Sequence, residues 1–330
     1  MTLTLAAPGI EVVLDPAHGA EILVVRRPGG ANVLATYDWA SPVWASRSTS
    51  YGRDETDWLS EYRGGWQELF PNAGPPSTVL GVPLPFHGEV SRAAWEVVDA
   101  TETAVTLRTP ARLPLILERR MSLDPVRAVL RVEEQVTTDA DVAVPFLWGH
   151  HPAFAAPVGA RIDLPPGVRA SVDPTYDPEP PAGDLRLGVR APWPVVEGRD
   201  GSPVRLDEVG PGPTDRVVFL DGFPDPAWAA VRGVAPGLGV AMAWDRAAFP
   251  CAWNWWQVEG PGHPWHGRAR IMAIEPATAW PADGLAAAAA LGTAHVVRPG
   301  EVRTAWLTMA LFDADERPVL AVDLAGTVTR

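Results

Sequence analysis

Apolar and polar side chains alternate along most of this chain, and a period of two predicts β-strands. Leucines and Met121 occupy every second position of segment 113–121, where Arg119 interrupts the apolar row. Segments 130–136 and 305–311 show the same alternation. Because each such strand has one apolar and one polar face, the pattern favours antiparallel sheets that cover a core on one side.

Signals for helix are weak, whereas turn signals are frequent. No long segment places apolar residues at positions i, i+3, i+4 and i+7, and only the alanine run 286–290 suits one or two helical turns. The 36 prolines and 30 glycines exclude long helices from most of the chain. Segment 165–212 is rich in Pro, Gly and Asp, which predicts long loops or short edge strands. We therefore predict an all-β fold, a large antiparallel β-sandwich forming one domain over residues 1–330.

Charge and cysteine content narrow the partners and the compartment. A formal net charge of -13 argues against nucleic acid or an anionic membrane as a partner, because no basic surplus can neutralise phosphates. All 27 basic residues are arginine, which excludes a lysine Schiff base or a lysine general base. The single cysteine, Cys251, fits a reducing compartment. Residues 1–15 lack signal-peptide features and the run 284–292 is too short to span a membrane, so we expect a soluble, cytoplasmic protein.

Five short motifs carry the candidate chemistry. They are RGGWQELFPNAG (63–74), PFHGEVSRAAW (85–95), WGHHPAF (148–154), TDRVVFL (214–220) and IEPATAWPADGL (274–285). Their order and spacing resemble the aldose 1-epimerase (galactose mutarotase) family, from about residue 20 to about residue 312. The resemblance implies a galactose mutarotase-like supersandwich of two large antiparallel sheets. It also implies an open sugar-binding groove on one concave sheet face.

The resemblance further implies a reaction, the interconversion of the α and β anomers of a free aldose. A base removes the proton of the C1 hydroxyl while an acid protonates the ring oxygen; the ring opens, the C1–C2 bond rotates, and the steps reverse on the other face. We expect the base and the acid on opposite sides of the anomeric centre, each contributing about 10²–10⁴-fold. The chemistry requires no metal, nucleotide or covalent intermediate, so we expect no cofactor and a small-molecule sugar as the partner.

Glu275 and His151 match the two catalytic positions of the family. Glu275 follows the apolar run 271–274, where a strand ends, and corresponds to the family's base; a solvated strand-end glutamate is the structural alternative. His151 corresponds to the acid when the motif is aligned on Phe154. The family has an asparagine where this chain has His150. Because adjacent residues of a strand point to opposite faces, only one of the two histidines is expected to enter the groove.

Five further residues are expected to bind the sugar. His87 matches a family histidine that hydrogen-bonds sugar hydroxyls or the ring oxygen, and Asp215 matches an aspartate that accepts from sugar hydroxyls. The family's arginine near Asn72 is absent, and we expect Arg63 to replace it. The chain has 15 tryptophans, and aromatic rings stack on the C–H faces of sugars. The tryptophans predicted to contact sugar are Trp253 and Trp66.

Other functions stay open at this point. A hexose-6-phosphate epimerase of the same fold needs arginines at one end of the groove, for which Arg63 and Arg92 are candidates. A non-catalytic carbohydrate-binding sandwich would keep the aromatic residues without needing both His151 and Glu275. A metal enzyme is a distant alternative, because the HPWH segment 263–266 lacks a cysteine or acidic partner at a familiar spacing, and we predict a polar loop at the groove rim instead. The sequence determines neither the natural sugar nor the oligomeric state.

Overall fold

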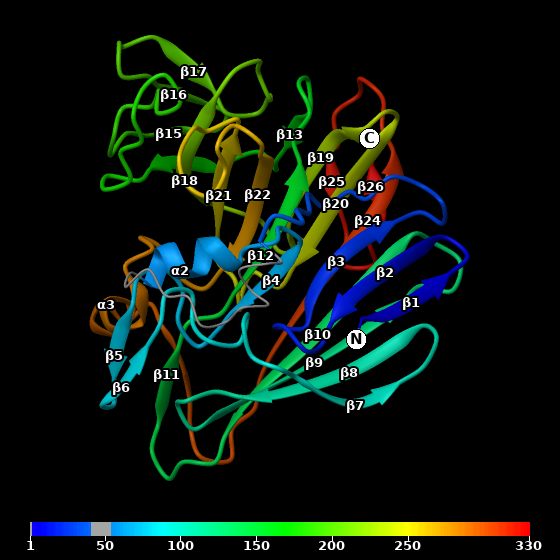
Figure 1. Cartoon of the computed structure of the whole chain (residues 1–330), viewed down its shortest axis with the longest axis vertical. Helices are drawn as coiled ribbons and strands as arrows, with labels where there is room; N and C mark the ends of the chain where they lie inside the picture. Colours follow the sequence, from blue (N-terminus) through cyan, green and yellow to red (C-terminus); the bar gives the residue numbers. More distant parts are fainter. Residues whose placement is uncertain (1, 41–53) are drawn as a thin grey trace.

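Two large antiparallel sheets pack against each other in the structure, a computed structural model that describes residues 2–40 and 54–330 (Figure 1). In spatial order, the ten-stranded sheet contains β1 (Leu3–Ala7), β2 (Ile10–Asp15), β3 (Glu21–Arg26), β4 (Trp66–Leu69), β12 (Gly149–Ala155), β22 (Arg270–Ala277), β21 (Cys251–Val258), β18 (Thr214–Asp221), β14 (Arg169–Val172) and β15 (Arg190–Pro192). The eight-stranded sheet contains β13 (Arg161–Asp163), β19 (Ala227–Ala235), β20 (Leu238–Trp244), β24 (Arg303–Asp313), β10 (Val129–Thr138), β9 (Leu115–Leu123), β8 (Ala104–Pro110) and β7 (Glu96–Ala100).

Four two-stranded ribbons and two short helices complete the described residues. The ribbons pair β5 (Ser77–Val79) with β6 (Val82–Leu84), β11 (Val144–Phe146) with β23 (His295–Val297), β16 (Val195–Glu197) with β17 (Pro203–Arg205), and β25 (Ala321–Val322) with β26 (Val328–Thr329). The helices are α2 (Asp54–Glu61) and α3 (Gly284–Leu291). The predicted all-β sandwich is thus confirmed, and segment 165–212 forms short strands and loops as expected.

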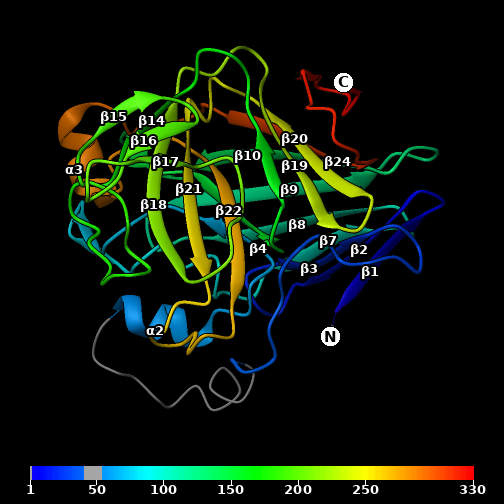
Figure 2. The same cartoon turned by 90° about the horizontal axis from the view of Figure 1, so that it is seen from above.

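The apolar faces predicted from the alternation meet between the two sheets. Leu117 of β9, Val132 of β10 and Leu307 of β24 are at most 1% exposed, and they belong to one continuous cluster with Phe154 of β12 and Ile274 of β22. Each such burial contributes about 1.5–3 kcal/mol. Figure 2 shows β18, β21 and β22 running across β8, β9 and β10, and the same cluster of buried side chains includes residues from all six strands.

The sequence predicted one of the two helices but not the other. The alanine run 286–290 forms part of α3, as expected. Helix α2 was not predicted, because its sequence DETDWLSE is mostly polar and lacks helical periodicity. An isolated helix of this length is marginal, so α2 depends on tertiary contacts. The Trp58 ring stacks on Tyr62 with centroids 4.9 Å apart, and Arg92 donates two hydrogen bonds to Glu61. Within the described residues, neither helix has the length or apolarity needed to cross a bilayer.

Candidate active site

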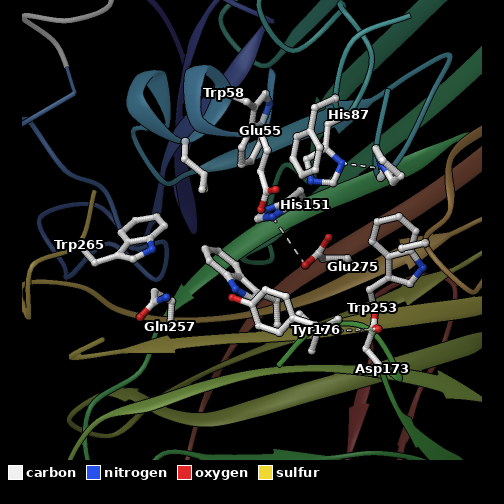
Figure 3. Close-up of a pocket in the computed structure, with 17 residues that line it drawn as sticks. Glu55, Trp58, His87, His151, Asp173, Tyr176, Trp253, Gln257, Trp265 and Glu275 are labelled. Atoms are coloured by element: carbon white, nitrogen blue, oxygen red, sulfur yellow. Dashed lines mark hydrogen bonds and ion pairs between the residues drawn. The ribbon is translucent and has the colours of Figure 1, made fainter. Parts of the chain in front are cut away.

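A cavity of about 180 Å³ lies on the outer face of the ten-stranded sheet, next to α2 (Figure 3). Its floor is made by β12, β22 and β21, whose side chains alternate between this face and the sandwich interior. Helix α2 and the loops that carry Phe86, Tyr176 and Trp265 form its sides. The cavity therefore collects residues from distant parts of the sequence, including all five motifs.

His151 and Glu275 face each other across neighbouring strands at the cavity floor. His151 Nε2 lies 3.6 Å from Glu275 Oε1. The register of β12 against β22, in which Gly149 pairs with Ala277, places the two residues opposite each other. Side chains at such a cross-strand position project to the same face of the sheet. The structure thus places the two groups side by side, whereas we expected them on opposite sides of an anomeric carbon.

Burial sets the proton content of this pair. Both residues are 3% exposed. Burial raises the pKa of Glu275 well above its usual range and lowers the pKa of His151 to about 4. Burial therefore favours the neutral form of both groups, with the proton of the pair on the carboxyl group of Glu275. This is the reverse of the expected ionised glutamate and protonated histidine, because a low-dielectric environment disfavours the charged form of each group.

His87 lines the same cavity as a neutral hydrogen-bond donor. Its ring centroid lies 6.1 Å from that of His151. The backbone N–H of Gly74 donates to His87 Nδ1 at 3.0 Å, so the proton of the neutral ring is on Nε2. Burial, assisted by His151, lowers the pKa of His87 well below its usual range. His87 has a φ of 59°, and Gly88 follows it because a Cβ there would lie 2.2 Å from the carbonyl oxygen of Phe70.

Asp215 lies behind the cavity wall, so the structure does not bear out a direct position for it on the cavity surface. The Tyr176 hydroxyl donates to Asp215 Oδ1 at 2.8 Å, and Gln257 Nε2 donates to Oδ2 at 3.2 Å. Tyr176 and Gln257 line the cavity, and Asp215 orients both. Gln257 Oε1 is buried without a hydrogen-bond partner among the described residues, which leaves it available to accept from a ligand hydroxyl.

Aromatic side chains enclose the cavity on several sides. Trp253, one of the expected sugar contacts, lines it, and its Nε1 donates to the carbonyl of Ala279 at 2.9 Å, which fixes the ring. In the β21–β22 register Trp253 pairs with Glu275, so an indole lies beside the carboxyl group. Such walls suit a ligand with alternating C–H faces and polar edges. The aromatic lining residues are Trp58, Phe86, Tyr176, Trp253, Trp255 and Trp265.

Arg63 does not reach the cavity wall, contrary to our expectation. Its Nη2 lies 2.6 Å from Glu21 Oε2 and 3.1 Å from Asp15 Oδ2. The glycines that follow it allow a close backbone crossing, since a Cβ on Gly64 would lie 2.1 Å from the carbonyl oxygen of Ala35. The fold therefore explains the RGG motif: its glycine allows the close crossing, and its arginine forms ion pairs with neighbouring carboxylates.

Trp66 is the second expected sugar contact that lies elsewhere. It is 2% exposed and lies on the interior side of β4, where its Nε1 donates to His150 Nδ1 at 3.2 Å. His150 and His151 thus point to opposite faces of β12, as strand geometry requires. Of the two, only His151 lines the cavity.

Several cavity residues were not identified from the sequence. Glu55 and Trp58 belong to the unpredicted α2, and Asp173 belongs to the turn-rich segment for which no elements were assigned. Gln257 could have been identified from the sequence, because it lies at i+4 from Trp253 on an alternating strand and therefore shares its face. The HPWH segment contributes Trp265 to the cavity, as a rim loop would. Its histidines belong to no group of potential metal ligands among the described residues.

A second group of ionisable residues lies on the interior side of β12. We call Glu68, Arg119, Glu134 and His150 the His150 cluster. Ligand atoms of its two carboxylates and the imidazole lie within 4.8 Å of one another, which is close enough to consider a metal ion. However, the Arg119 guanidinium donates to both carboxylates, and Trp148 Nε1 donates to Glu68 at 2.7 Å. A cation is already supplied by the chain, so these residues do not fit a resident metal.

Comparisons with known proteins support the fold. No family model matches the chain, and no curated protein matches its sequence. Solved structures do match. A protein of Synechocystis sp. PCC 6803 superposes with a TM-score of 0.67 at 18% identity, covering 95% of this chain and 96% of the other. A putative aldose 1-epimerase from Escherichia coli K12 gives 0.63 at 15% identity, covering 95% and 99%.

A galactose mutarotase related enzyme from Lactobacillus acidophilus gives a TM-score of 0.62 at 18% identity, covering 97% of this chain and 100% of the other. At such identities the likeness establishes a shared fold over nearly the whole chain. The architecture is therefore that of the mutarotase-like and putative aldose 1-epimerase structures.

Proposed function

We propose that this chain is a cofactor-free aldose 1-epimerase that interconverts the α and β anomers of a free aldose. The observation that carries the proposal is the buried His151–Glu275 pair, which holds one proton at the floor of an aromatic-walled cavity. The shared fold with putative aldose 1-epimerases supports it. A carbohydrate-binding sandwich without catalysis would have no use for such a pair.

The geometry suits proton transfer at the anomeric centre. The C1 hydroxyl oxygen and the ring oxygen are bonded to the same carbon, so two groups 3.6 Å apart serve both at once. Glu275 donates its proton to the ring oxygen while neutral His151 takes the proton of the C1 hydroxyl, and the ring opens. After rotation about C1–C2, both transfers reverse on the other face. The roles expected from the resemblance, Glu275 as base and His151 as acid, then apply to ring closure.

The remaining cavity residues fit the binding of an uncharged sugar. His87 Nε2–H is a donor for a sugar oxygen, and Gln257 Oε1 is an acceptor for a sugar hydroxyl. Aromatic rings pack on the C–H faces of a pyranose. These contacts hold the sugar while its anomeric carbon is free to react, which is how positioning contributes to rate.

The charges around the cavity favour an uncharged aldose over a hexose 6-phosphate. The carboxylates of Glu55 and Asp173 line the cavity, and no arginine does so among the described residues. Arg63 is used by Glu21 and Asp15, as described above. Arg92 is held by two hydrogen bonds of 2.8 Å to Glu61. A phosphate dianion placed there would meet carboxylates instead of the guanidinium groups that bind it best.

The proposal is tested by following anomer exchange in freshly dissolved α-sugars by polarimetry or exchange NMR, with the spontaneous rate subtracted. The panel contains neutral hexoses, neutral pentoses and glucose 6-phosphate. We expect acceleration with at least one neutral aldose. Saturable binding without acceleration would identify a non-catalytic carbohydrate-binding protein, and acceleration confined to glucose 6-phosphate would identify the phosphate-specific alternative.

A further inference from the structure

The His151–Glu275 pair lies where the hydrogen-bonded ladder between its two strands is interrupted. Regular pairing of β12 with β22 occurs at Gly149 and again at Ala153–Ala155, with no pairs between them. Each member of the pair is followed by a proline, Pro152 or Pro276, and a proline has no N–H to donate to a ladder. The backbone between β12 and β22 therefore does little to fix the distance between the two side chains.

On the other face of β12, His150 is held from three directions. Its Nε2 lies 3.1 Å from Glu134 Oε2 on β10 of the opposite sheet. On β4, Trp66 donates to its Nδ1, and Glu68 Oε2 lies 3.4 Å from the same nitrogen. Arg119 of β9 then links the two carboxylates. Each side chain is at most 2% exposed, so no water screens these contacts.

The His150 cluster consequently ties β12 to β4 in its own sheet and to β9 and β10 in the other. The neighbouring residue on β12 is His151, whose side chain leaves from the opposite face. A displacement of the His150 backbone thus moves His151 relative to Glu275, because β22 is not bonded to β12 at this level. At this point β12 is held by its pairing with β4 over Gly149–Pro152 and by the His150 cluster, and not by its ladder with β22.

We propose that His150 is a positioning residue, and that the His150 cluster sets the distance between His151 and Glu275. The inference rests on the proposed function for its kinetic consequence, although the structural consequence can be measured without turnover. His150 does not touch the cavity, so it acts through the strand that carries His151. The histidine at this place, where the related family has asparagine, has the reach to contact Glu134 in the opposite sheet.

The test compares His150→Leu, which removes both ring nitrogens, with His150→Gln, whose amide can still donate to Glu134. We expect kcat of the folded His150→Leu protein to fall at least ~10-fold with little change in KM, part of the ~10²-fold that a 1 Å displacement can cost. His150→Gln should recover most of the loss. NMR titration of the His151 ring should show a changed pKa in His150→Leu and a pKa near wild type in His150→Gln.

The matched control is Asp163→Asn, which weakens the ion pair with Arg232, another little-exposed pair that links β13 and β19 far from the cavity. It should lower the melting temperature and leave kcat, KM and the His151 titration unchanged. If His150→Leu does not fold, Glu134→Gln, which conserves volume, takes its place.

A folded His150→Leu protein with wild-type kcat and an unchanged His151 titration overturns the inference, even if it melts earlier. If the wild type accelerates no sugar, the proposed function fails, and the His151 titration alone decides on the positioning role: a shifted pKa supports it and an unchanged pKa overturns it.

Discussion

Buried glutamates of other strands lie against both faces of β12, and the pKa values of Glu275 on one face and Glu134 on the other are shifted in opposite directions. Glu275, across from His151 on the cavity face, and Glu134, beside His150 in the interior, are both 3% exposed. Burial raises the pKa of Glu275 well above its usual range. Burial acts in the same direction on Glu134, yet His150 and Arg119 outweigh it and lower its pKa to about 2. Equal burial therefore accompanies opposite pKa shifts, because Glu134 has cationic and hydrogen-bonding partners that Glu275 lacks. The third buried carboxyl group, that of Glu68, shares these partners with Glu134, but burial and the charge of Glu134 raise its pKa to about 7.

This difference separates chemistry from support. A carboxyl without a fixed cation gives up or takes a proton when a ligand supplies a partner, which general acid–base catalysis requires. A carboxylate locked between a guanidinium and an imidazole keeps its charge and its position. Removing one partner from such a cluster is strongly destabilising, because it leaves an uncompensated buried charge. The intact cluster is therefore rigid.

The largest expected effect is on turnover in Glu275→Gln. The amide keeps the shape and can hydrogen-bond a sugar, but it cannot exchange the proton. We expect kcat to fall by ~10²–10⁴-fold with little change in KM, the result for a group needed mainly in the transition state. Anomer exchange and thermal melts of variant and wild type check this. A variant that melts normally and turns over at the wild-type rate would remove Glu275 from the mechanism.

The second prediction separates the adjacent histidines of β12. His151→Asn should lower kcat by ~10²-fold or more, because it removes the group that exchanges the proton of the C1 hydroxyl. His150→Asn should be milder, because residue 150 does not enter the cavity. Asparagine is too short to reach Glu134, so we still expect a small loss. Steady-state kinetics on both variants show which substitution lowers kcat more. A larger loss for His150→Asn would mean that His150, and not His151, has the catalytic role.

The third prediction concerns the pH dependence of kcat/KM. The active free protein holds one proton on the pair, so the profile is bell-shaped. Its acidic limb should lie near pH 4, where His151 takes up a second proton, and its alkaline limb reflects loss of the Glu275 proton. In Glu275→Gln the alkaline limb should disappear from any residual activity. An acidic limb that follows Glu275 instead would restore the order first expected from the sequence.

The fourth prediction contrasts the same substitution on the two faces. In wild type, the raised pKa of Glu275 contributes stability that is present below pH 4.5 and is lost as pH rises through the folded pKa. Glu275→Gln should therefore gain stability relative to wild type as pH rises from 5 to 8.

Glu134→Gln should instead be less stable than wild type by about 3 kcal/mol or more at neutral pH. That difference should shrink as pH falls from 4.5 toward 2, because the lowered pKa of Glu134 contributes stability only above this window. Urea unfolding at several pH values measures both trends, and equal signs for the two variants would contradict the comparison.

The smallest expected effect is that of chelation. The acid–base pair needs no metal, and the one group of potential ligands in the described residues is occupied by Arg119. Exchange rates after exhaustive dialysis against a chelator should match those of untreated protein within error. A loss of turnover that a divalent ion restores would shift attention to His87 and His151 as ligands.

Sequence patterns were sufficient to predict those features that depend only on residues close together in the chain. Alternation along segments 113–121 and 305–311 predicts strands, since residues two apart share a face. The same rule separates His150 from His151. It also marks Arg119 as an exception on an apolar face, which the structure explains by the His150 cluster.

Patterns failed where a residue's partner lies far away in the chain. Arg63 and Trp66 occupy a motif that resembles a binding site, but Glu21 and His150 take up their polar groups. Asp215 reaches the cavity only through Tyr176 and Gln257, which lie 39 residues before it and 42 residues after it in the chain. Helix α2 has no periodicity of its own and forms because neighbouring loops hold it.

The sequence by itself determined the fold class and the strands, because alternation is a property of neighbouring residues, and its resemblance to a family of aldose 1-epimerases supplied the candidate pair His151 and Glu275. Only the tertiary structure decided which side chains share the cavity and which proton the pair carries. Both depend on the surroundings that distant strands create: the register of β12 against β22 brings His151 opposite Glu275, and burial among residues from other elements shifts both pKa values.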